Sequence, residues 1–366
     1  MAVRNPGLIG RAITAFALAA SLSAVASGTN VAMAGADVCE LGEGELTIGD
    51  LPAGSSVISC DAIGRLVTYD GTGVTVPEPG TAVSIDMLTA DGDTHGFTLQ
   101  VGTDGKVSYN LGDASTDTST AGSDRPDPLA NTADPAADVQ AEGDAVADPS
   151  DASEGAEVAD IDALSAPGAC SDGAYKTNDL KEYGTYNWYI GDDPMPGGLS
   201  RTDAKWAFYD AIDNITDSYN NCGYGDSVGA KTNFLSETGR EASVSKTGRC
   251  TGNDGISVWD AGDIKDSAVA TTCTYSWSMP GVKNDLREAG VRFNTHDYDF
   301  TNKPTGSCSN KYDIRSVGTH EAGHVFGLGH VGDGHENLTM FTNSFVCTTK
   351  ARTLGKGDVL ALRSVY

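Results

Sequence analysis

Residues 320–330 read His-Glu-Ala-Gly-His-Val-Phe-Gly-Leu-Gly-His, and this stretch decides the fold of the C-terminal half of the chain. His320 and His324 are four residues apart, a spacing that places both imidazoles on one face of a helix, one turn apart. Two such rings can bind a single ion at Zn–N distances of about 2.0–2.1 Å. Glu321 lies beside the first ligand, where its carboxylate can reach water at the metal. The spacing therefore predicts a helix that carries two ligands and a base.

The third histidine, His330, follows the second by six residues. A continuous helix would carry it about 9 Å further along the axis, so the helix must end and the chain must turn. Gly327 stands where this turn is needed, because glycine adopts the positive φ of a helix C-cap without steric cost. Such a pattern has a chance expectation of roughly one in 100,000 in a chain of this composition. Three ligands leave an open position for water, whereas structural zinc sites usually have four.

The segment is similar to the extended zinc signature of the metzincin metallopeptidases, HExxHxxGxxH. Its surroundings resemble the matrixin branch of that superfamily. Residues 312–319 resemble the start of the active-site helix, residues 289–294 the strand before it, and residues 353–362 the closing helix. The resemblance covers roughly residues 180–366. It implies an α+β catalytic domain in which a twisted mixed sheet packs with an active-site helix, a methionine turn and a C-terminal helix.

The resemblance also implies a site and an activity. His320, His324 and His330 would bind one catalytic Zn²⁺, and Glu321 would be the general base. Met340 is the candidate for the methionine beneath the zinc, with an ordinary core side chain as the alternative. Phe341 and Thr342 follow it where matrixins usually have Tyr and Pro. The expected function is that of a zinc endopeptidase acting on protein or peptide substrates, and Ca²⁺ is left open as a further ion.

The N-terminus has the pattern of a secretory signal peptide, assigned to residues 1–34. Arg4 and Arg11 precede an apolar run, and Ala32-Met33-Ala34 offers small residues for cleavage. The eight cysteines that follow form no Cys-x-x-Cys pair, so we expect disulfides and a secreted, extracellular protein. Cys39 and Cys60 are expected to pair with each other. Cys170 is the candidate for a zinc-capping free cysteine, which the even cysteine count disfavours.

Composition divides the exported chain into three parts. Residues 35–112 alternate short apolar runs with glycine turns, which predicts a small all-β domain that is either a propeptide or a retained binding module. Residues 113–167 carry eleven Asp and three Glu against one Arg, which predicts an extended acidic linker without a packed core. Residues 168–366 form the catalytic domain. In it we predict a helix from Ser200 to Tyr219, begun by a capping box, and strands at 186–190, 230–234, 256–259, 268–277 and 290–294.

A net charge of −27 argues against nucleic-acid binding and against an electrostatic hold on anionic membranes. No stretch after the signal is apolar enough for membrane insertion, and we expect a monomer. Two other functions stay open. One is a non-catalytic zinc-containing extracellular binding protein, for which an intact Glu321 would be unnecessary. The other is a zinc hydrolase that acts on a non-peptide amide or ester.

Overall fold

The structure is a computed structural model that describes residues 39–93, 95–112, 166–265 and 267–366. The expected signal peptide (1–34) lies outside the described residues. So does the acidic segment, apart from residues 166 and 167.

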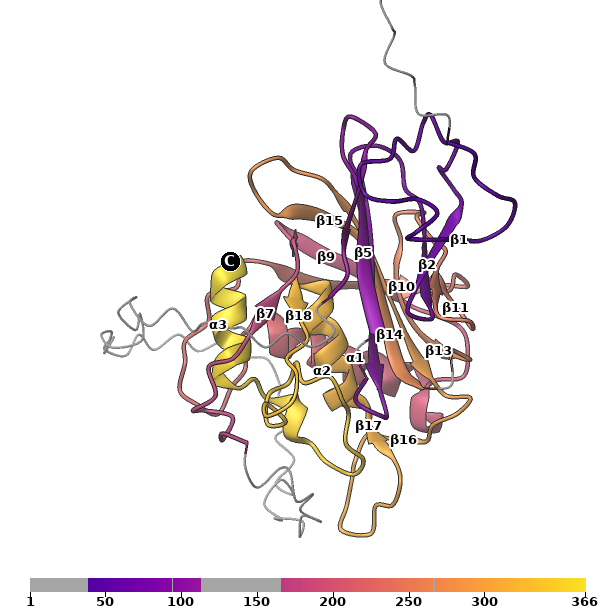
Figure 1. Ribbon diagram of the computed structural model, residues 1–366. Helices are drawn as coiled ribbons and strands as arrows, with labels where there is room; N and C mark the ends of the chain where they lie inside the picture. The colour runs from indigo at the N-terminus through magenta and orange to yellow at the C-terminus, as the bar shows by residue number, and fades with distance from the viewer. Residues whose placement is uncertain (1–38, 94, 113–165, 266) are drawn as a thin grey trace, which may run out of the picture. The chain divides into compact units, whose positions relative to one another are not determined.

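The largest element of the described residues is a mixed sheet of nine strands (Figure 1). Its order is β10-β9-β13-β15-β14-β4-β5-β6, and β8 pairs with β15 outside this path. Neighbours are parallel from β10 to β15 and antiparallel from β15 to β6. The strands are β4 (Thr81–Thr89), β5 (His95–Val101), β6 (Val107–Asn110), β8 (Leu180–Lys181), β9 (Thr185–Ile190), β10 (Lys231–Glu237), β13 (Ser257–Gly262), β14 (Ala268–Trp277) and β15 (Asn284–Asn294).

A second sheet has five short strands in the order β1-β2-β3-β12-β11. These are β1 (Leu46–Thr47), β2 (Leu66–Tyr69), β3 (Thr72–Thr75), β11 (Val244–Ser245) and β12 (Arg249–Cys250). Two further pairs join β16 (Phe300–Thr301) to β17 (Tyr312–Asp313), and β7 (Lys176–Thr177) to β18 (Leu328–Gly329).

The described helices are α1 (Arg201–Thr216), α2 (Ile314–Val325) and α3 (Lys356–Val365), with 3-10 turns at Pro196–Gly198 and Lys350–Arg352. The predicted start of α1 is confirmed, since Ser200 Oγ accepts a hydrogen bond of 3.1 Å from the Asp203 amide. Helices α1 and α2 pack closely because Gly318 has no side chain: a Cβ there would lie 2.8 Å from Ala211 Cβ.

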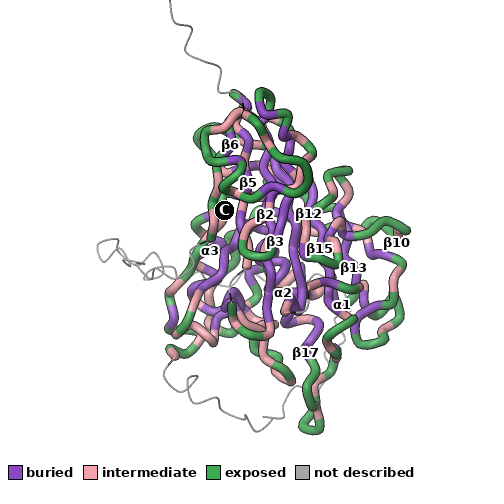
Figure 2. The backbone as a smooth tube through the Cα atoms, turned by 45° about the vertical axis from the view of Figure 1, so that its right-hand side comes forward, coloured by how far each residue is buried: buried purple, intermediate pink, exposed green. Residues whose placement is uncertain are grey.

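The strands predicted from alternation and turn signals are confirmed as β9, β10, β13, β14 and part of β15, each within a few residues of the expected ends. The closing helix expected near residues 353–362 is α3. Two apolar cores lie on opposite faces of the large sheet. One, under α1 and α2, includes Trp188, Trp259, Phe208 and Phe293. Figure 2 shows buried backbone concentrated in the central strands and in α2.

Residues 39–112 do not form the separate β domain that was expected, because they share the second core with the C-terminal part of the chain. Residues 39–112 and 166–366 belong to one compact unit. Val83 and Ile85 of β4 share a core with Cys273 and Tyr275 of β14, and β3 pairs with β12. The physical reason is that β14 without β4 would have unpaired backbone groups along one edge and an exposed apolar face, and residues 39–112 cover both. Composition alone separates segments along the sequence but does not show that they pair in space.

Four disulfides join the described cysteines: Cys39–Cys60, Cys170–Cys222, Cys250–Cys273 and Cys308–Cys347. The expected Cys39–Cys60 pair is confirmed. Cys170 is bonded to Cys222, so it is not a free thiol that could cap a metal. Among the described helices, none combines the length and apolar character needed to cross a bilayer.

Glu288 of β15 carries a buried carboxyl group, and its surroundings predict how the stability of the protein depends on pH. It lies opposite Tyr275, accepts a hydrogen bond of 2.6 Å from the Gly255 amide, and keeps one oxygen without a partner. Burial raises the pKa of Glu288 to about 7. The folded state therefore binds more protons than the unfolded state between about pH 4.5 and 7, so this group makes the free energy of unfolding fall as pH rises through that window.

We expect Glu288→Gln, which cannot ionise, to remove on the order of 2–3 kcal/mol of that fall. Urea unfolding at pH 5 and pH 7.5 measures the difference. The exposed Glu43→Gln serves as the control and should leave the pH dependence unchanged. A Glu288→Gln protein as pH-sensitive as the parent would contradict the expectation.

Candidate metal centre

Helix α2 presents the first two histidines because both of its ends are defined. Asp313 is the N-cap, accepts a hydrogen bond of 2.9 Å from the Ser316 amide, and is paired with Arg352 at 2.7 Å. The helix ends before Gly327, whose φ is +89°. A Cβ at Gly327 would also collide with the carbonyl oxygen of Leu180. The chain therefore turns at Gly327 as expected. Both the positive φ and the close approach to β8 require glycine at this position.

After this turn, β18 pairs with β7 and the chain returns to the helix. The structure brings the three predicted histidines together. The Nε2 atoms of His320 and His330 lie 3.0 Å apart, and His324 Nε2 lies 3.1 Å from each of them. All three rings are buried. Among the described residues, no other His, Cys, Asp or Glu belongs to a group of this kind.

Backbone carbonyls orient two of the rings. His320 Nδ1 lies 2.8 Å from the Thr339 carbonyl oxygen, and His324 Nδ1 lies 3.1 Å from that of Leu328. A carbonyl only accepts, so Nδ1 must carry the proton in both rings. Burial lowers the pKa of all three histidines, that of His324 to about 4. The rings are therefore neutral at pH 7, and the Nε2 atoms of His320 and His324 present lone pairs with no proton between them.

The donor set fits a zinc ion. Four tetrahedral ligands at Zn–N distances of about 2.0–2.1 Å place neighbouring nitrogens about 3.3 Å apart, a few tenths of an ångström more than the separations here. An Nδ1–H bonded to a carbonyl is also the usual outer partner of a metal-binding histidine. A cation would replace the lone-pair repulsion with three bonds. For the Ca²⁺ left open above, the described residues contain no second cluster of three or more such side chains.

Glu321 lies beside the histidines and is fully buried. Its Oε2 accepts a hydrogen bond of 2.6 Å from Thr272 Oγ1 of β14, while its Oε1 has no partner. Burial, with a smaller contribution from the nearby Asp86 carboxylate, raises the pKa of Glu321 to about 8. One oxygen is thus held in place and the other has no partner, and a cation bound by the nearby histidines would favour the ionised carboxylate that can accept a proton.

Met340 is buried against α2, and its predicted place beneath a zinc ion stays a prediction. Its side chain packs against Gly323, and a Cβ at Gly323 would collide with the Met340 sulfur. The turn is held by Asp358 of α3, whose carboxylate accepts hydrogen bonds from the amides of Thr339 at 2.9 Å and Met340 at 3.2 Å. Burial raises the pKa of Asp358 to about 6. Since the Thr339 carbonyl oxygen lies 2.8 Å from His320 Nδ1, this turn also positions one of the three histidines.

Sequence reasoning missed four residues of this centre: Thr272, Asp358, Gly323 and Asp86. Gly323 had a signal, because glycine inside a helix is unfavourable by about 1 kcal/mol and therefore suggests close packing. Asp358 lies three residues after Gly355, whose amide donates to its carboxylate at 2.8 Å, a spacing typical of a helix start. Thr272 and Asp86 had no local signal, since their roles depend on strand pairing.

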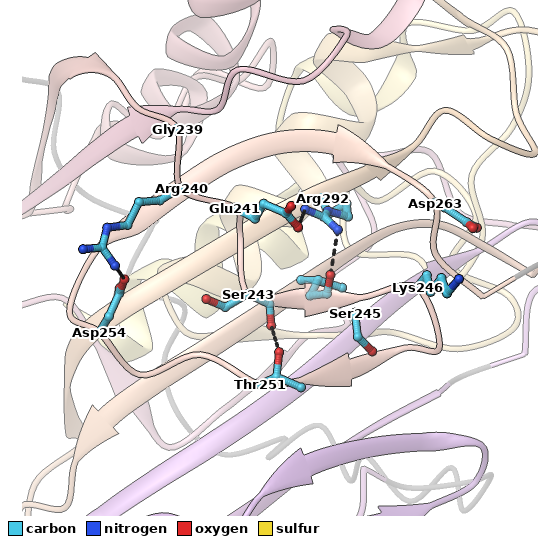
Figure 3. A pocket seen from close by; sticks show the side chains of 11 residues that line it. Gly239, Arg240, Glu241, Ser243, Ser245, Lys246, Thr251, Asp254, Asp263 and Arg292 are labelled. Carbon is cyan, nitrogen blue, oxygen red and sulfur yellow. Dashed lines mark hydrogen bonds and ion pairs between the residues drawn. The ribbon is translucent and has the colours of Figure 1, made fainter.

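The hollow in Figure 3 lies elsewhere and offers no comparable centre. It has a volume of about 790 Å³ and lies at residues 239–254, 263 and 292. Its arginines are neutralised: Arg240 pairs with Asp254 at 2.6 Å, and Arg292 pairs with Glu241 at 2.8 Å and Asp260 at 2.6 Å. Lys246 and Asp263 also line the hollow, so side chains of both charge signs lie along it.

No protein-family model matches the chain, and no curated protein is found to be similar to it. The function must therefore be argued from the centre itself. Three converging imidazoles, a buried carboxylate with one free oxygen and a supporting methionine turn are groups that can hold a divalent metal and move a proton.

The close contact between Gly323 and Met340 predicts how substitutions at these two positions change stability. We expect Gly323→Ala to lower the free energy of unfolding by about 1–3 kcal/mol, because the added methyl group overfills the contact with the methionine. In a Met340→Ala background the same change should be neutral or stabilising by up to about 1 kcal/mol, since alanine favours the helix. Urea unfolding of the four proteins gives the coupling energy.

Gly332→Ala is the control, because a Cβ there would meet open space. Equal effects of Gly323→Ala in both backgrounds would show that the clash with Met340 is not the cause.

Proposed function

We propose that the protein is a secreted zinc-dependent endopeptidase that resembles the matrixin branch of the metzincins. The observation that carries the proposal is the convergence of three neutral imidazoles beside a buried carboxylate that has one free oxygen. A structural zinc site would be expected to have a fourth protein ligand.

His320, His324 and His330 would hold the metal, oriented by the Thr339 and Leu328 carbonyls. A bound Zn²⁺ would act as a Lewis acid that polarises a peptide carbonyl and makes water acidic enough to lose a proton near neutral pH. The buried surroundings strengthen these electrostatic effects, because they exclude solvent screening.

Glu321 would act as the general base. Its free Oε1 accepts a proton from the attacking water while the water oxygen bonds to the scissile carbonyl carbon. The carboxyl group then gives this proton to the departing nitrogen as the C–N bond breaks, and the second water proton passes from the new carboxyl group to the amine, so the products are one carboxylate and one ammonium group. Thr272 holds the other oxygen and fixes the orientation of the carboxylate during both transfers.

The two alternatives are weaker for a physical reason. Burying the Glu321 carboxyl is unfavourable for stability. A catalytic role would account for this burial, whereas a non-catalytic binding protein would not need the group. A hydrolase of non-peptide amides or esters would use the same base. Comparing peptide and ester substrates side by side separates that activity from the proposed one.

The four disulfides are compatible with an extracellular protein, because such bonds persist in oxidising compartments. Secretion through the signal peptide at residues 1–34 and a monomeric state are part of the proposal.

Two substitutions test the assigned roles, with casein digestion assayed before and after limited proteolysis of the secreted protein. Glu321→Ala should keep about one zinc per chain and lose about 10²–10⁴-fold in rate, since only the base is removed. His324→Ala should lose both zinc and activity, because a ligand is missing. Casein digestion at the parental rate by Glu321→Ala, or stoichiometric zinc in His324→Ala, would contradict the proposal.

Thr272 tests the positioning of the base. Thr272→Val should lower kcat by about 10-fold or more at unchanged zinc content and similar KM, because the carboxylate loses its orienting donor. Thr272→Ser keeps the hydroxyl and is the matched control, expected near the parental kcat. Equal kcat values for the valine and serine variants would show that the hydrogen bond does not matter for the reaction.

A further inference from the structure

The proposed catalytic groups cannot be reached by a polypeptide in this structure. Glu321 and His324 are 0% exposed, His320 is 2% exposed and His330 is 8% exposed. A general base must come within about 3 Å of the water or proton that it acts on, with the substrate beside it. If the protein is an endopeptidase, as proposed above, the described arrangement is therefore a closed one.

Strand β4 is the part of residues 39–112 that lies over the centre. It pairs antiparallel with β14 from Thr81↔Trp277 to Thr89↔Ala268. Figure 1 shows that strands of the N-terminal part continue the sheet beside β14 and α2. Without β4, the backbone N–H and C=O groups along this side of β14 would form a free sheet edge, which is a surface that extended peptides bind.

The register places a side chain of β4 at the centre. Asp86 is opposite Thr272, and directly opposite residues of an antiparallel pair project to the same face. Thr272 is the donor to Glu321, and Asp86 Oδ1 lies 3.9 Å from His324 Nδ1. Asp86 is held by Ser84 Oγ at 3.0 Å. The strand thus covers both the proposed base and one proposed ligand.

We infer that residues 39–112 keep this centre closed, with β4 in the place beside β14 that an extended polypeptide would need. The inference deepens the proposed function and rests on it. It also decides between the two roles considered for this segment, since a strand buried over the catalytic groups acts as an inhibitory propeptide rather than as an independent binding module.

Cutting the chain between residues 112 and 166 should not be enough to open the centre. Residues 39–112 are also held by the pairing of β3 with β12 and by the core shared by Val83, Ile85, Cys273 and Tyr275. These contacts do not depend on the covalent connection. A cut chain should therefore stay closed until the segment itself is digested or dissociates.

The test uses the full chain with a recognition site for a specific protease inserted between residues 140 and 141. Ser84→Cys with Thr274→Cys adds a cross-strand disulfide between β4 and β14, because the two residues are opposite each other. Thr98→Cys with Asn110→Cys is the matched control, since it joins β5 to β6 within the segment. Mass spectrometry verifies all disulfides.

Each protein is loaded with Co²⁺, cut in the linker and then treated briefly with trypsin. The readout is the change in visible Co²⁺ absorption on adding a dipeptide hydroxamate, together with the mass of the remaining fragments. In the parent and the control, the absorption change should appear only as peptides from residues 39–112 are lost. In the β4–β14 disulfide variant it should stay absent although the linker is cut.

Hydroxamate binding by the uncut chain, or equal binding by the β4–β14 disulfide variant and the control, would overturn the inference and make β4 a permanent wall. Loss of Co²⁺ and of the far-ultraviolet circular dichroism spectrum together with the segment would overturn it as well. Opening without any peptide cleavage by the parent would support the inference while contradicting the endopeptidase proposal. Casein cleavage by the intact chain would support the endopeptidase proposal and contradict the inference that residues 39–112 keep the centre closed.

Discussion

Three buried imidazoles converge with their Nε2 atoms 3.0–3.1 Å apart, an arrangement that a cation among them would stabilise, and the C-terminal half of the protein is organised around this convergence. Carbonyls of Thr339 and Leu328 hold the Nδ1 protons of two rings, which leaves their Nε2 lone pairs facing His330. Desolvation lowers the pKa of all three rings and so favours their neutral forms. The helix end at Gly327, the methionine turn and the close packing at Gly323 all serve this convergence.

The supporting structure reaches the proposed metal centre through successive contacts. Asp358 of α3 binds the amides of Thr339 and Met340, Thr339 orients His320, and Met340 fills the space that Gly323 leaves in α2. A buried carboxylate with several amide donors is a strong positioning group, because charge-assisted hydrogen bonds are about twice as strong as neutral ones. The C-terminal helix is therefore part of the centre although it supplies no ligand.

Sheet pairing connects the N-terminal segment to the same centre. Strand β14 pairs with β15 on one side and with β4 on the other, so Thr272 and Asp86 meet at Glu321 from different parts of the chain. Closure by β4 uses backbone pairing and a shared apolar core rather than a thiol on the metal, and Cys170 is committed to a disulfide. In such an arrangement, a protein whose cysteines form disulfides could keep the proposed metal centre closed.

The sequence by itself determined the local features: the helix with His320 and His324, the turn at Gly327, the capped helix after Ser200 and most strands of the catalytic part. These depend on spacing, φ preferences and alternation, which are properties of neighbouring residues. Only the tertiary structure decided that residues 39–112 join the large sheet, that Asp358 supports the methionine turn, and that Thr272 and Asp86 lie at Glu321. Their positions depend on strand register and on contacts between separate elements, with 18 residues between Asp358 and Met340 and 49 between Thr272 and Glu321. Such contacts leave no periodic pattern in the sequence of either element.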